Sequence, residues 1–156
     1  MEKMVKVMAT GTFDLLHMGH IYYLREAKKL GDTLVVVVAT DSTVQKLKHD
    51  PITPQESRVN LIKELSMVDE VYLGHDDDMY TIVQEIKPDI IALGFDQIHN
   101  DATIENELKK RKLNVKLVRL PKYEGGSDLD GTRRIIQKVI AAYEFQKKMQ
   151  RIEGKT

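Results

Sequence analysis

The stretch Thr10-Gly11-Thr12-Phe13-Asp14-Leu15-Leu16-His17-Met18-Gly19-His20 decides the fold of this 156-residue chain. The apolar run at residues 4–9 before it predicts a buried strand, and residues 21–30 after it carry apolar side chains at three-residue spacing, as on one face of a helix. The stretch therefore crosses from a strand to a helix. In a parallel α/β sheet such a crossing, at the carboxyl end of a strand, is where a ligand binds.

Two histidines, His17 and His20, lie three residues apart where this helix is expected to begin, so their imidazoles fall on nearly the same face. Gly19 between them removes a side chain that would hold a phosphate away from the backbone, and the first N–H groups of a helix are unpaired donors. The stretch therefore predicts a phosphate site. The alternative is a pair of histidines that only cap the helix or lie on its surface.

The composition excludes several classes of protein. The 24 basic and 24 acidic residues balance, so no overall charge indicates nucleic acid or a membrane as partner. The absence of cysteine excludes disulfides and thiol chemistry. The chain carries no apolar run of about 18 residues and enters its first strand without a signal-peptide pattern. We expect a cytoplasmic protein with one domain over residues 1–156.

Strands and helices alternate along the rest of the chain. Strands are predicted at residues 33–40, 69–73, 89–94 and 115–120, and helices at residues 41–48, 54–65, 80–86, 102–112 and 132–150. The last of these strands is expected at a sheet edge because its side chains alternate. Gly31 is expected to cap the first helix, and Asp41-Ser42 the second. The alternation predicts an α/β fold with a single doubly wound parallel sheet and a C-terminal helix.

The segment Gly11-Thr12-Phe13-Asp14-Leu15-Leu16-His17-x-Gly19-His20 resembles, over its whole length, the nucleotide-binding motif of the cytidylyltransferase-like nucleotidyltransferases. That group includes glycerol-3-phosphate and phosphocholine cytidylyltransferases and the archaeal FAD synthases, and the resemblance extends from Val5 to about Ile140. It implies a Rossmann-like sheet of the HxGH type. It also implies attack of a phosphate oxygen on the α-phosphorus of a nucleoside triphosphate, with release of pyrophosphate and with Mg²⁺ or another divalent cation beside the triphosphate.

The resemblance assigns roles to the motif and to the loop after the second strand. It implies that His17 and His20 act on the phosphates as catalytic residues, and that the nucleotide also lies against Thr12, Phe13, Met18 and Gly19. A family lysine that reaches the phosphates is matched by Lys46 or Lys48, for each of which a solvated helix end is the alternative. Arg58 matches a family arginine, and a phosphate contact, an ion pair and a dimer contact stay open for it.

Two later segments complete the expected site. Asp96, in Leu93-Gly94-Phe95-Asp96-Gln97, matches a nucleotide-contacting position, with a cap of the next turn as its alternative. The family's phosphate-binding turn before the last helix fits in two registers. Glu124-Gly125-x-Ser127 matches the cytidylyltransferase form, whereas Asp130-Gly131-Thr132 followed by Arg134 matches the form of adenylyl-transferring relatives.

We prefer the second register, because it places Thr132 in the first turn of a helix that starts near Gly131. Thr132 and Arg134 are then nucleotide-binding candidates, and Asp14, Tyr123 and Ser127 are weaker substrate candidates. For Tyr123, a half-buried packing role is the alternative to stacking on a base or flavin. No metal-ligating cluster is predicted, and Asp76-Asp77-Asp78 is expected to be a solvated turn.

Only the resemblance to known proteins indicates which substrates this protein uses. The segment Pro88-Asp89-Ile90-Ile91-Ala92-Leu93-Gly94 and the Asp130-Gly131-Thr132 ending look most like stand-alone archaeal FAD synthases, which implies transfer of AMP from ATP to FMN. The alternative is cytidylyl transfer from CTP to glycerol-3-phosphate or a similar phosphate ester. A nucleotide-binding protein without turnover is a third hypothesis. The resemblance also implies a homodimer.

Overall fold

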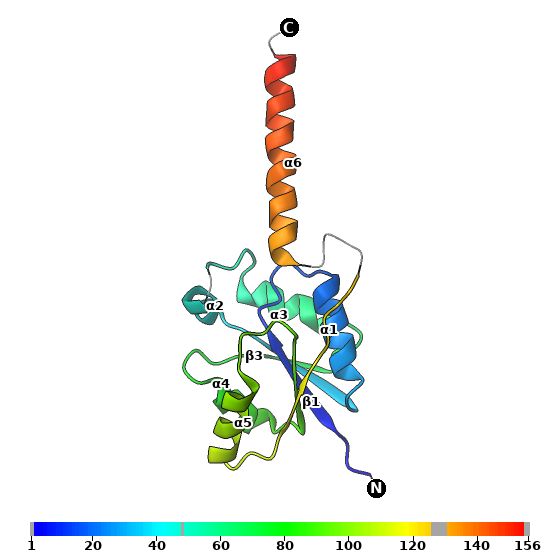
Figure 1. Ribbon diagram of the computed structural model, residues 1–156, viewed down its shortest axis with the longest axis vertical. Helices are drawn as coiled ribbons and strands as arrows, with labels where there is room; N and C mark the ends of the chain where they lie inside the picture. Colours follow the sequence, from blue (N-terminus) through cyan, green and yellow to red (C-terminus); the bar gives the residue numbers. More distant parts are fainter. Residues whose placement is uncertain (1, 48, 126–130, 155–156) are drawn as a thin grey trace.

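The computed structural model describes residues 2–47, 49–125 and 131–154 (Figure 1). The described residues form five strands, β1 (Lys6–Gly11), β2 (Thr33–Val38), β3 (Glu70–Leu73), β4 (Ile90–Leu93) and β5 (Lys116–Arg119). They also form six helices, α1 (Met18–Lys28), α2 (Asp41–Leu47), α3 (Gln55–Lys63), α4 (Met79–Ile86), α5 (Asp101–Lys110) and α6 (Thr132–Glu153). The type and order of the predicted elements are confirmed, and Lys48 and Ser127 lie outside the described residues.

The strands form one parallel sheet in the order β3-β2-β1-β4-β5. Strand β1 lies at the centre of the sheet, with β2 and β3 on one side of it and β4 and β5 on the other. The predicted doubly wound sheet is therefore confirmed, with β5 at an edge as expected. The order reverses between β1 and β4, and in such folds the crevice outside the carboxyl ends of these two strands is the ligand site.

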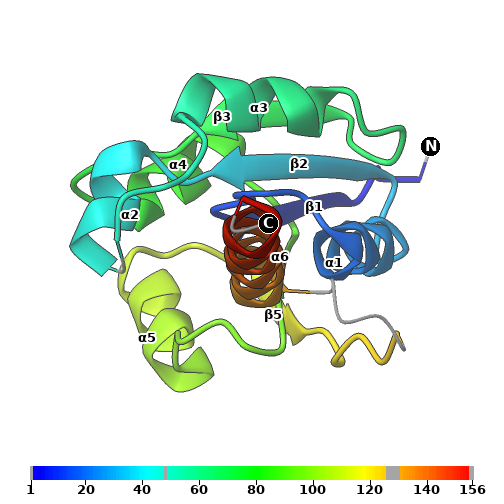
Figure 2. The same cartoon turned by 90° about the horizontal axis from the view of Figure 1, so that it is seen from above.

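Helices cover both faces of the sheet, as Figure 2 shows from above. One core joins the sheet to α1 and α3 through Leu24, Ala27 and Ile62, and a second core joins it to α4 and α5. Strand β2 contributes Val36 to the first core and Val37 to the second. Because both faces of β2 are buried, its apolar run is continuous instead of alternating.

Two predictions about helix ends were wrong. Helix α1 ends at Lys28, and its C-cap residue is Lys29, whose backbone is right-handed. No glycine among the described residues has a positive φ. Gly31 instead lies against the start of the sheet, where an added Cβ would come 2.7 Å from the carbonyl oxygen of Val5. Helix α2 is capped by Thr40, whose Oγ1 accepts from Thr43 N at 3.1 Å, and not by Asp41 or Ser42.

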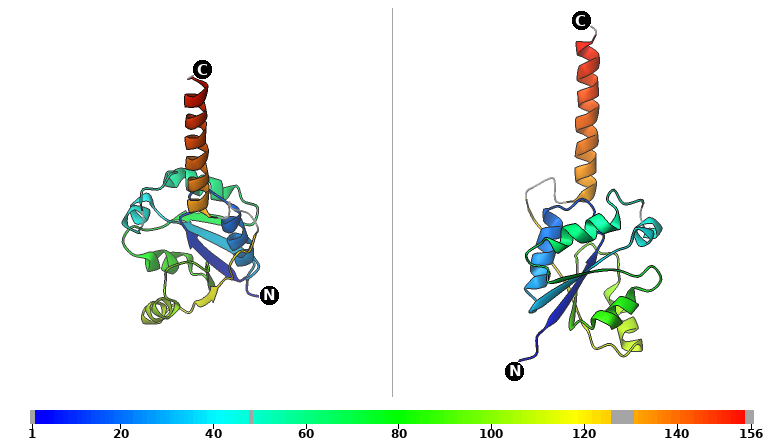
Figure 3. Two further views of the ribbon diagram at one scale, coloured as in Figure 1. Left: turned by 45° about the horizontal axis from the view of Figure 1, so that its top comes forward. Right: turned by 180° about the vertical axis from the view of Figure 1, so that it is seen from behind.

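Helix α6 stands out from the rest of the protein. Figures 1 and 3 show it rising from the carboxyl end of the sheet, and none of its residues is buried. Its apolar side chains include Val139, Ile140 and Tyr143, which are more than half exposed. No helix in the described parts of the chain is both long and apolar enough to cross a membrane.

We predict that Gly31→Ala lowers the free energy of unfolding by about 1–3 kcal/mol, because the new methyl group overlaps backbone that cannot move without displacing β1. Urea denaturation of both proteins measures the difference. Gly74→Ala is the matched control, since its added Cβ would meet its nearest neighbours at an ordinary 3.5 Å. Equal stability of the Gly31→Ala protein and the wild type would contradict this packing role.

Candidate active site

The loop between β1 and α1 is held in an unusual backbone conformation by a buried aromatic ring. Phe13 and Leu15 have φ values of 55° and 51°, a left-handed region that costs free energy for residues with a side chain. The Phe13 side chain is 2% exposed and packs against Tyr23 and the edge of His20, with ring centroids 6.4 and 5.4 Å apart. Gly11 makes room for this ring, because an added Cβ would lie 2.9 Å from Phe13 Cζ.

His17 and His20 form a stacked pair at the start of α1. Their ring centroids are 3.7 Å apart, and both side chains are partly exposed. His17 is the N-cap of the helix, and its Nδ1 accepts from Gly19 N at 3.1 Å. An accepting Nδ1 assigns the proton of the neutral ring to Nε2. The capping role that was the alternative for His17 is therefore present, and it fixes the orientation of the ring.

Asp14 ties this loop to the loop before α3. Its carboxylate accepts from Ile52 N at 2.7 Å, Thr53 N at 3.0 Å and Thr53 Oγ1 at 2.6 Å. Burial raises the pKa of Asp14, but the hydrogen bonds from Thr53 and Ile52 and the charge of Arg58 outweigh it and hold the pKa below its usual value. The carboxylate is therefore charged at neutral pH, and these contacts engage it within the protein.

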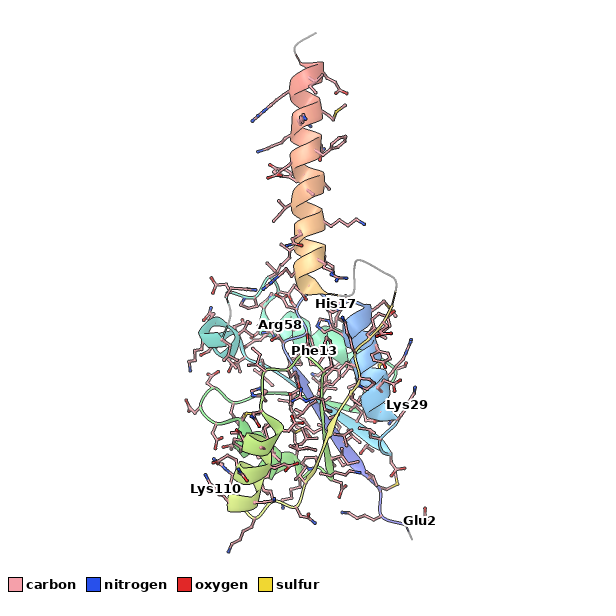
Figure 4. All side chains as sticks on the ribbon, viewed as in Figure 1. Glu2, Phe13, His17, Lys29, Arg58 and Lys110 are labelled. Carbon is pink, nitrogen blue, oxygen red and sulfur yellow. The ribbon has the colours of Figure 1, made fainter. Side chains whose placement is uncertain are left out.

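Arg58, which is 0% exposed, joins the ends of two strands. Its Nη1 donates to the carbonyl oxygens of Thr12 at 2.7 Å and Ala39 at 2.8 Å, beyond β1 and β2 respectively. Its Nε donates to Thr53 O at 3.0 Å, and its Nη2 pairs with Asp41 at 2.7 Å. Of the three roles left open, the structure shows an ion pair, inside a buried network that fixes the loop (Figure 4).

Tyr23 and Gln97 link the carboxyl ends of β1 and β4. Pairing of these strands ends at Ala9 and Ala92, so the backbone of Thr10 has no strand partner on that side. The Tyr23 hydroxyl accepts from Thr10 N at 3.2 Å and donates to Ala92 O at 2.7 Å. Burial raises the pKa of Tyr23, so the phenol stays protonated.

The Gln97 carboxamide makes a second link between the ends of β1 and β4. It donates to Thr10 O at 2.7 Å and accepts from Gly94 N at 3.1 Å. Sequence analysis missed both Tyr23 and Gln97 as site-forming residues. For Gln97 a signal existed, since it directly follows the predicted Asp96 in the same segment.

Asp96 itself is exposed in the turn after β4. The cap of the following helix is Asn100, whose side chain accepts from Ala102 N at 2.9 Å, and not Asp96. Arg119 supports the turn by donating to Gly94 O at 2.7 Å and to Gln97 O at 3.2 Å. Asp96 therefore lies in an exposed turn whose flanking carbonyl oxygens, those of Gly94 and Gln97, are bound by Arg119.

The start of α6 reaches the motif loop from the far end of the chain. Gly131 is the N-cap, as the preferred register predicts, and Thr132 is the first helical residue. Thr132 Oγ1 donates to Asp14 O at 2.9 Å, a contact across 118 residues. Two helix N-termini, those of α1 and α6, are thereby brought to one loop. Arg134 lies in the first turn of α6 and is exposed.

The remaining predicted site residues lie in α1, in α2 and in the segment after β5. Met18 and Lys46 are exposed, at the start of α1 and in the last turn of α2. Tyr123 is half-buried and packs against Tyr22 of α1, with ring centroids 5.1 Å apart, which is the packing position considered as its alternative. Asp78 caps α4 through Tyr80 N at 2.9 Å. The described ranges contain no group of three or more histidines and carboxylates placed to hold a metal.

The fold and the site together define a class. A doubly wound parallel sheet with paired histidines at the N-terminus of the helix after β1, and a second helix N-terminus beside it, is typical of a Rossmann-like nucleotide-binding protein of the HxGH type. Comparison with known proteins gives the family. The family model described as Cytidylyltransferase-like matches residues 8–152, and the chain belongs to this family.

Curated relatives match most of the chain. The FAD synthase of Aciduliprofundum boonei is 57% identical over 137 residues, which cover 88% of this chain and 91% of that protein. The FAD synthase of Thermoplasma volcanium is 49% identical over 137 residues, which cover 88% and 95% of the two chains.

Solved structures match the fold. A protein from Thermoplasma volcanium described as a lipopolysaccharide core biosynthesis protein superposes with a TM-score of 0.77 at 52% identity, covering 78% of this chain and 100% of that one. A pantoate-beta-alanine ligase from Francisella tularensis superposes with a TM-score of 0.57 at 17% identity, covering 80% and 61%. The second likeness shows the fold alone.

We predict that Arg58→Met lowers the free energy of unfolding by about 3–5 kcal/mol, because it removes every donor of a buried network and leaves Asp41 without its cation. Chemical denaturation measures the loss. Lys63→Met, at an exposed position of the same helix, changes stability by less than about 0.5 kcal/mol. A stable Arg58→Met protein with a raised KM for nucleotide would instead place Arg58 on the phosphates.

Proposed function

We propose that this nucleotidyltransferase is an FAD synthase, which transfers AMP from ATP to the terminal phosphate of FMN and releases pyrophosphate. The observation that carries the proposal is the stacked His17–His20 pair at the N-terminus of α1, the helix that follows β1 where the strand order reverses. The relatives named FAD synthase, at up to 57% identity over most of the chain, support FMN and ATP as the substrates.

In the proposed reaction a terminal oxygen of the FMN phosphate attacks the α-phosphorus of ATP. A bond forms between them, the bond from the α-phosphorus to the bridging oxygen breaks, and pyrophosphate leaves with the electron pair. The protein supplies little covalent chemistry and acts by positioning the phosphates and stabilising developing charge. The imidazole rings of His17 and His20 are the proposed donors.

The nucleotide is proposed to lie along the motif loop and across the crevice. The backbone of Thr12 and Phe13 would face the triphosphate together with Met18 and Gly19, and Asp96 would accept from the ribose or the base. At α6, Arg134 and the first N–H groups would hold phosphate oxygens, while the hydroxyl of Thr132 fixes the helix to Asp14.

The remaining proposed contacts concern the phosphates and the flavin. Lys46 or Lys48 would reach the phosphates of both substrates. Asp14, Tyr123 and Ser127 are weaker substrate candidates, and the contacts of Asp14 with Thr53 support a positioning role for it.

Mg²⁺ or another divalent cation is proposed to accompany ATP. Magnesium commonly keeps several waters and is held by substrate phosphates with few protein carboxylates. That mode fits a site whose described residues include no cluster of three metal ligands. When bound, the ion would neutralise charge on the triphosphate. We further propose that the protein forms one domain, acts in the cytoplasm and is a homodimer.

The proposed function is tested by pyrophosphate release from the purified protein with Mg²⁺, crossing ATP and CTP with FMN and glycerol-3-phosphate. We expect release with ATP plus FMN only, with FAD formed in equal amount. Release with CTP plus glycerol-3-phosphate would establish the cytidylyltransferase alternative. No release with any pair would favour a nucleotide-binding protein without turnover.

We predict that His20→Ala and His17→Asn each lower kcat by on the order of 100-fold or more, with little change in the KM for ATP, because the imidazoles act on charge that develops in the transition state. The variant His17→Asn keeps a side-chain acceptor for Gly19 N, so it separates capping from catalysis. Steady-state kinetics measures both effects. His75→Ala, at an exposed histidine beyond β3, serves as the control.

Equal losses of ATP binding and of turnover in the two histidine variants would contradict this role. Such a result would mean that the imidazoles bind substrate and transition state equally.

A further inference from the structure

Arg119, the last residue of β5, holds together the loop that joins β4 to α5. Its Nη1 donates to the carbonyl oxygens of Gly94 at 2.7 Å and Gln97 at 3.2 Å, and its Nη2 donates to that of His99 at 2.8 Å. Its Nε donates to the carboxylate of Asp101 at 3.1 Å, and its Nη2 also pairs with this carboxylate. A guanidinium carries five N–H groups, and these acceptors engage all of them.

This arrangement repeats that of Arg58 at the ends of β1 and β2. Arg58 also binds three backbone carbonyl oxygens, and it pairs with Asp41, the first residue of α2. Asp101 is likewise the first residue of α5, where the helix dipole favours a carboxylate. Two guanidiniums therefore frame the carboxyl end of the sheet. Arg58 fixes the loop that carries the histidines, and Arg119 fixes the loop that carries Asp96.

The turn after β4 is also fixed from the side of β1. The carboxamide of Gln97 donates to Thr10 O at 2.7 Å and accepts from Gly94 N at 3.1 Å. Phe95 and Asp96, which lie between these anchors, are exposed. The Asp96 carboxylate lies close to the end of β4, since a Cβ added to Gly94 would be 3.6 Å from Asp96 Oδ1. The turn thus presents an aromatic ring and a carboxylate on a backbone that is held from two directions.

We propose that Arg119 is a positioning residue for the nucleoside of ATP. It holds the turn whose exposed side chains, Phe95 and Asp96, contact the nucleoside, and it does not itself bind the triphosphate. An arginine that binds phosphate needs N–H donors directed at the ligand, whereas those of Arg119 are directed at protein acceptors. An aromatic ring suits stacking on a base, and a carboxylate accepts from hydroxyl or amino groups. The inference rests on the proposed function, in which Asp96 contacts the nucleoside.

Displacing this turn should weaken binding of ATP without slowing the chemical step. The nucleoside takes no part in bond making at the α-phosphorus, so its contacts are equally strong in the ground state and in the transition state. Loss of such uniform binding raises KM and leaves kcat unchanged. The opposite pattern is expected for the histidine variants described above, so one assay distinguishes the two parts of the site.

The first test compares Arg119→Met and Arg119→Lys with the wild type in steady-state kinetics. We expect both variants to raise the KM for ATP by on the order of 10-fold or more, with kcat and the KM for FMN within about two-fold of the wild type. Lysine keeps the charge, but its single ammonium cannot bridge three carbonyl oxygens and a carboxylate. A wild-type KM for ATP in Arg119→Lys would mean that charge alone suffices, which overturns the proposal.

Arg111→Met is the matched control for these variants. Arg111 is the C-cap residue of α5 and pairs with Asp78 at 2.7 Å, and its side chain is 30% exposed, compared with 28% for Arg119. The KM for ATP of this variant should equal that of the wild type. An equal rise of this KM in Arg111→Met and Arg119→Met would indicate a general loss of structure and overturn the specific role of Arg119.

The second test separates the nucleoside from the triphosphate. Each protein is titrated calorimetrically with ATP and with inorganic triphosphate, in the presence of Mg²⁺ and without FMN. We expect Arg119→Met to weaken ATP binding by on the order of 10-fold or more and to leave binding of inorganic triphosphate unchanged. Equal weakening of both ligands would assign Arg119 to the phosphates and overturn the proposal. Unchanged binding of both ligands would overturn it as well.

Gln97→Met tests the same turn without altering Arg119. It removes the links to Thr10 and Gly94 and should give the same selective loss of ATP binding, so it decides the question even if Arg119→Met does not fold. Unchanged ATP affinity in a folded Gln97→Met protein overturns the proposal. Because the titrations contain no FMN, a wild type that binds ATP and forms no FAD contradicts only the proposed function.

Discussion

The buried guanidinium of Arg58 is the interaction on which the geometry of the site depends. It binds carbonyl oxygens beyond β1 and β2 and in the loop before α3, and its charge is balanced by Asp41. A guanidinium withdrawn from water is tolerated only when its donors are satisfied. Satisfying them requires that three separate chain segments lie together, which fixes the loop that carries the histidines.

The same loop is fixed again from its other side by Asp14. The side chain of Asp14 binds the 52–53 backbone, and its carbonyl oxygen accepts from Thr132 at the start of α6. The left-handed backbone at Phe13 and Leu15 is thereby held by contacts on several sides, which is how such strain persists at functional sites. The stacked imidazoles are therefore positioned before any ligand binds, as the electrostatic role proposed for them requires.

The sequence predicted the fold and the start of α1 at the histidine motif because both depend on local pattern. The continuous apolar run of β2 indicated a strand buried on two faces, and the glycine-histidine motif indicated the N-terminus of a helix. The N-cap of α6 at Gly131 followed from the same reasoning. Each of these signals lies within a few residues of the feature that it predicts.

The features that sequence analysis did not predict depend on contacts between distant segments of the chain. Gly31 is required by the close approach of Val5, and nothing beside Gly31 in the chain distinguishes that role from a helix cap. The sequence around Tyr23 indicates only one more residue of an amphipathic helix, although its hydroxyl binds Thr10 on the β4 side, where Thr10 has no strand partner. For Arg58 the matching arginine was recognised, but only the burial of its side chain distinguishes an internal network from a phosphate contact.

The position of helix α6 is coupled to the geometry of the site. Three of its apolar side chains, Val139, Ile140 and Tyr143, are more than half exposed. Because Thr132 binds the backbone of Asp14, the direction in which α6 leaves the sheet is coupled to the loop that carries His17. Any partner that fixes the direction of α6 therefore also restrains that loop.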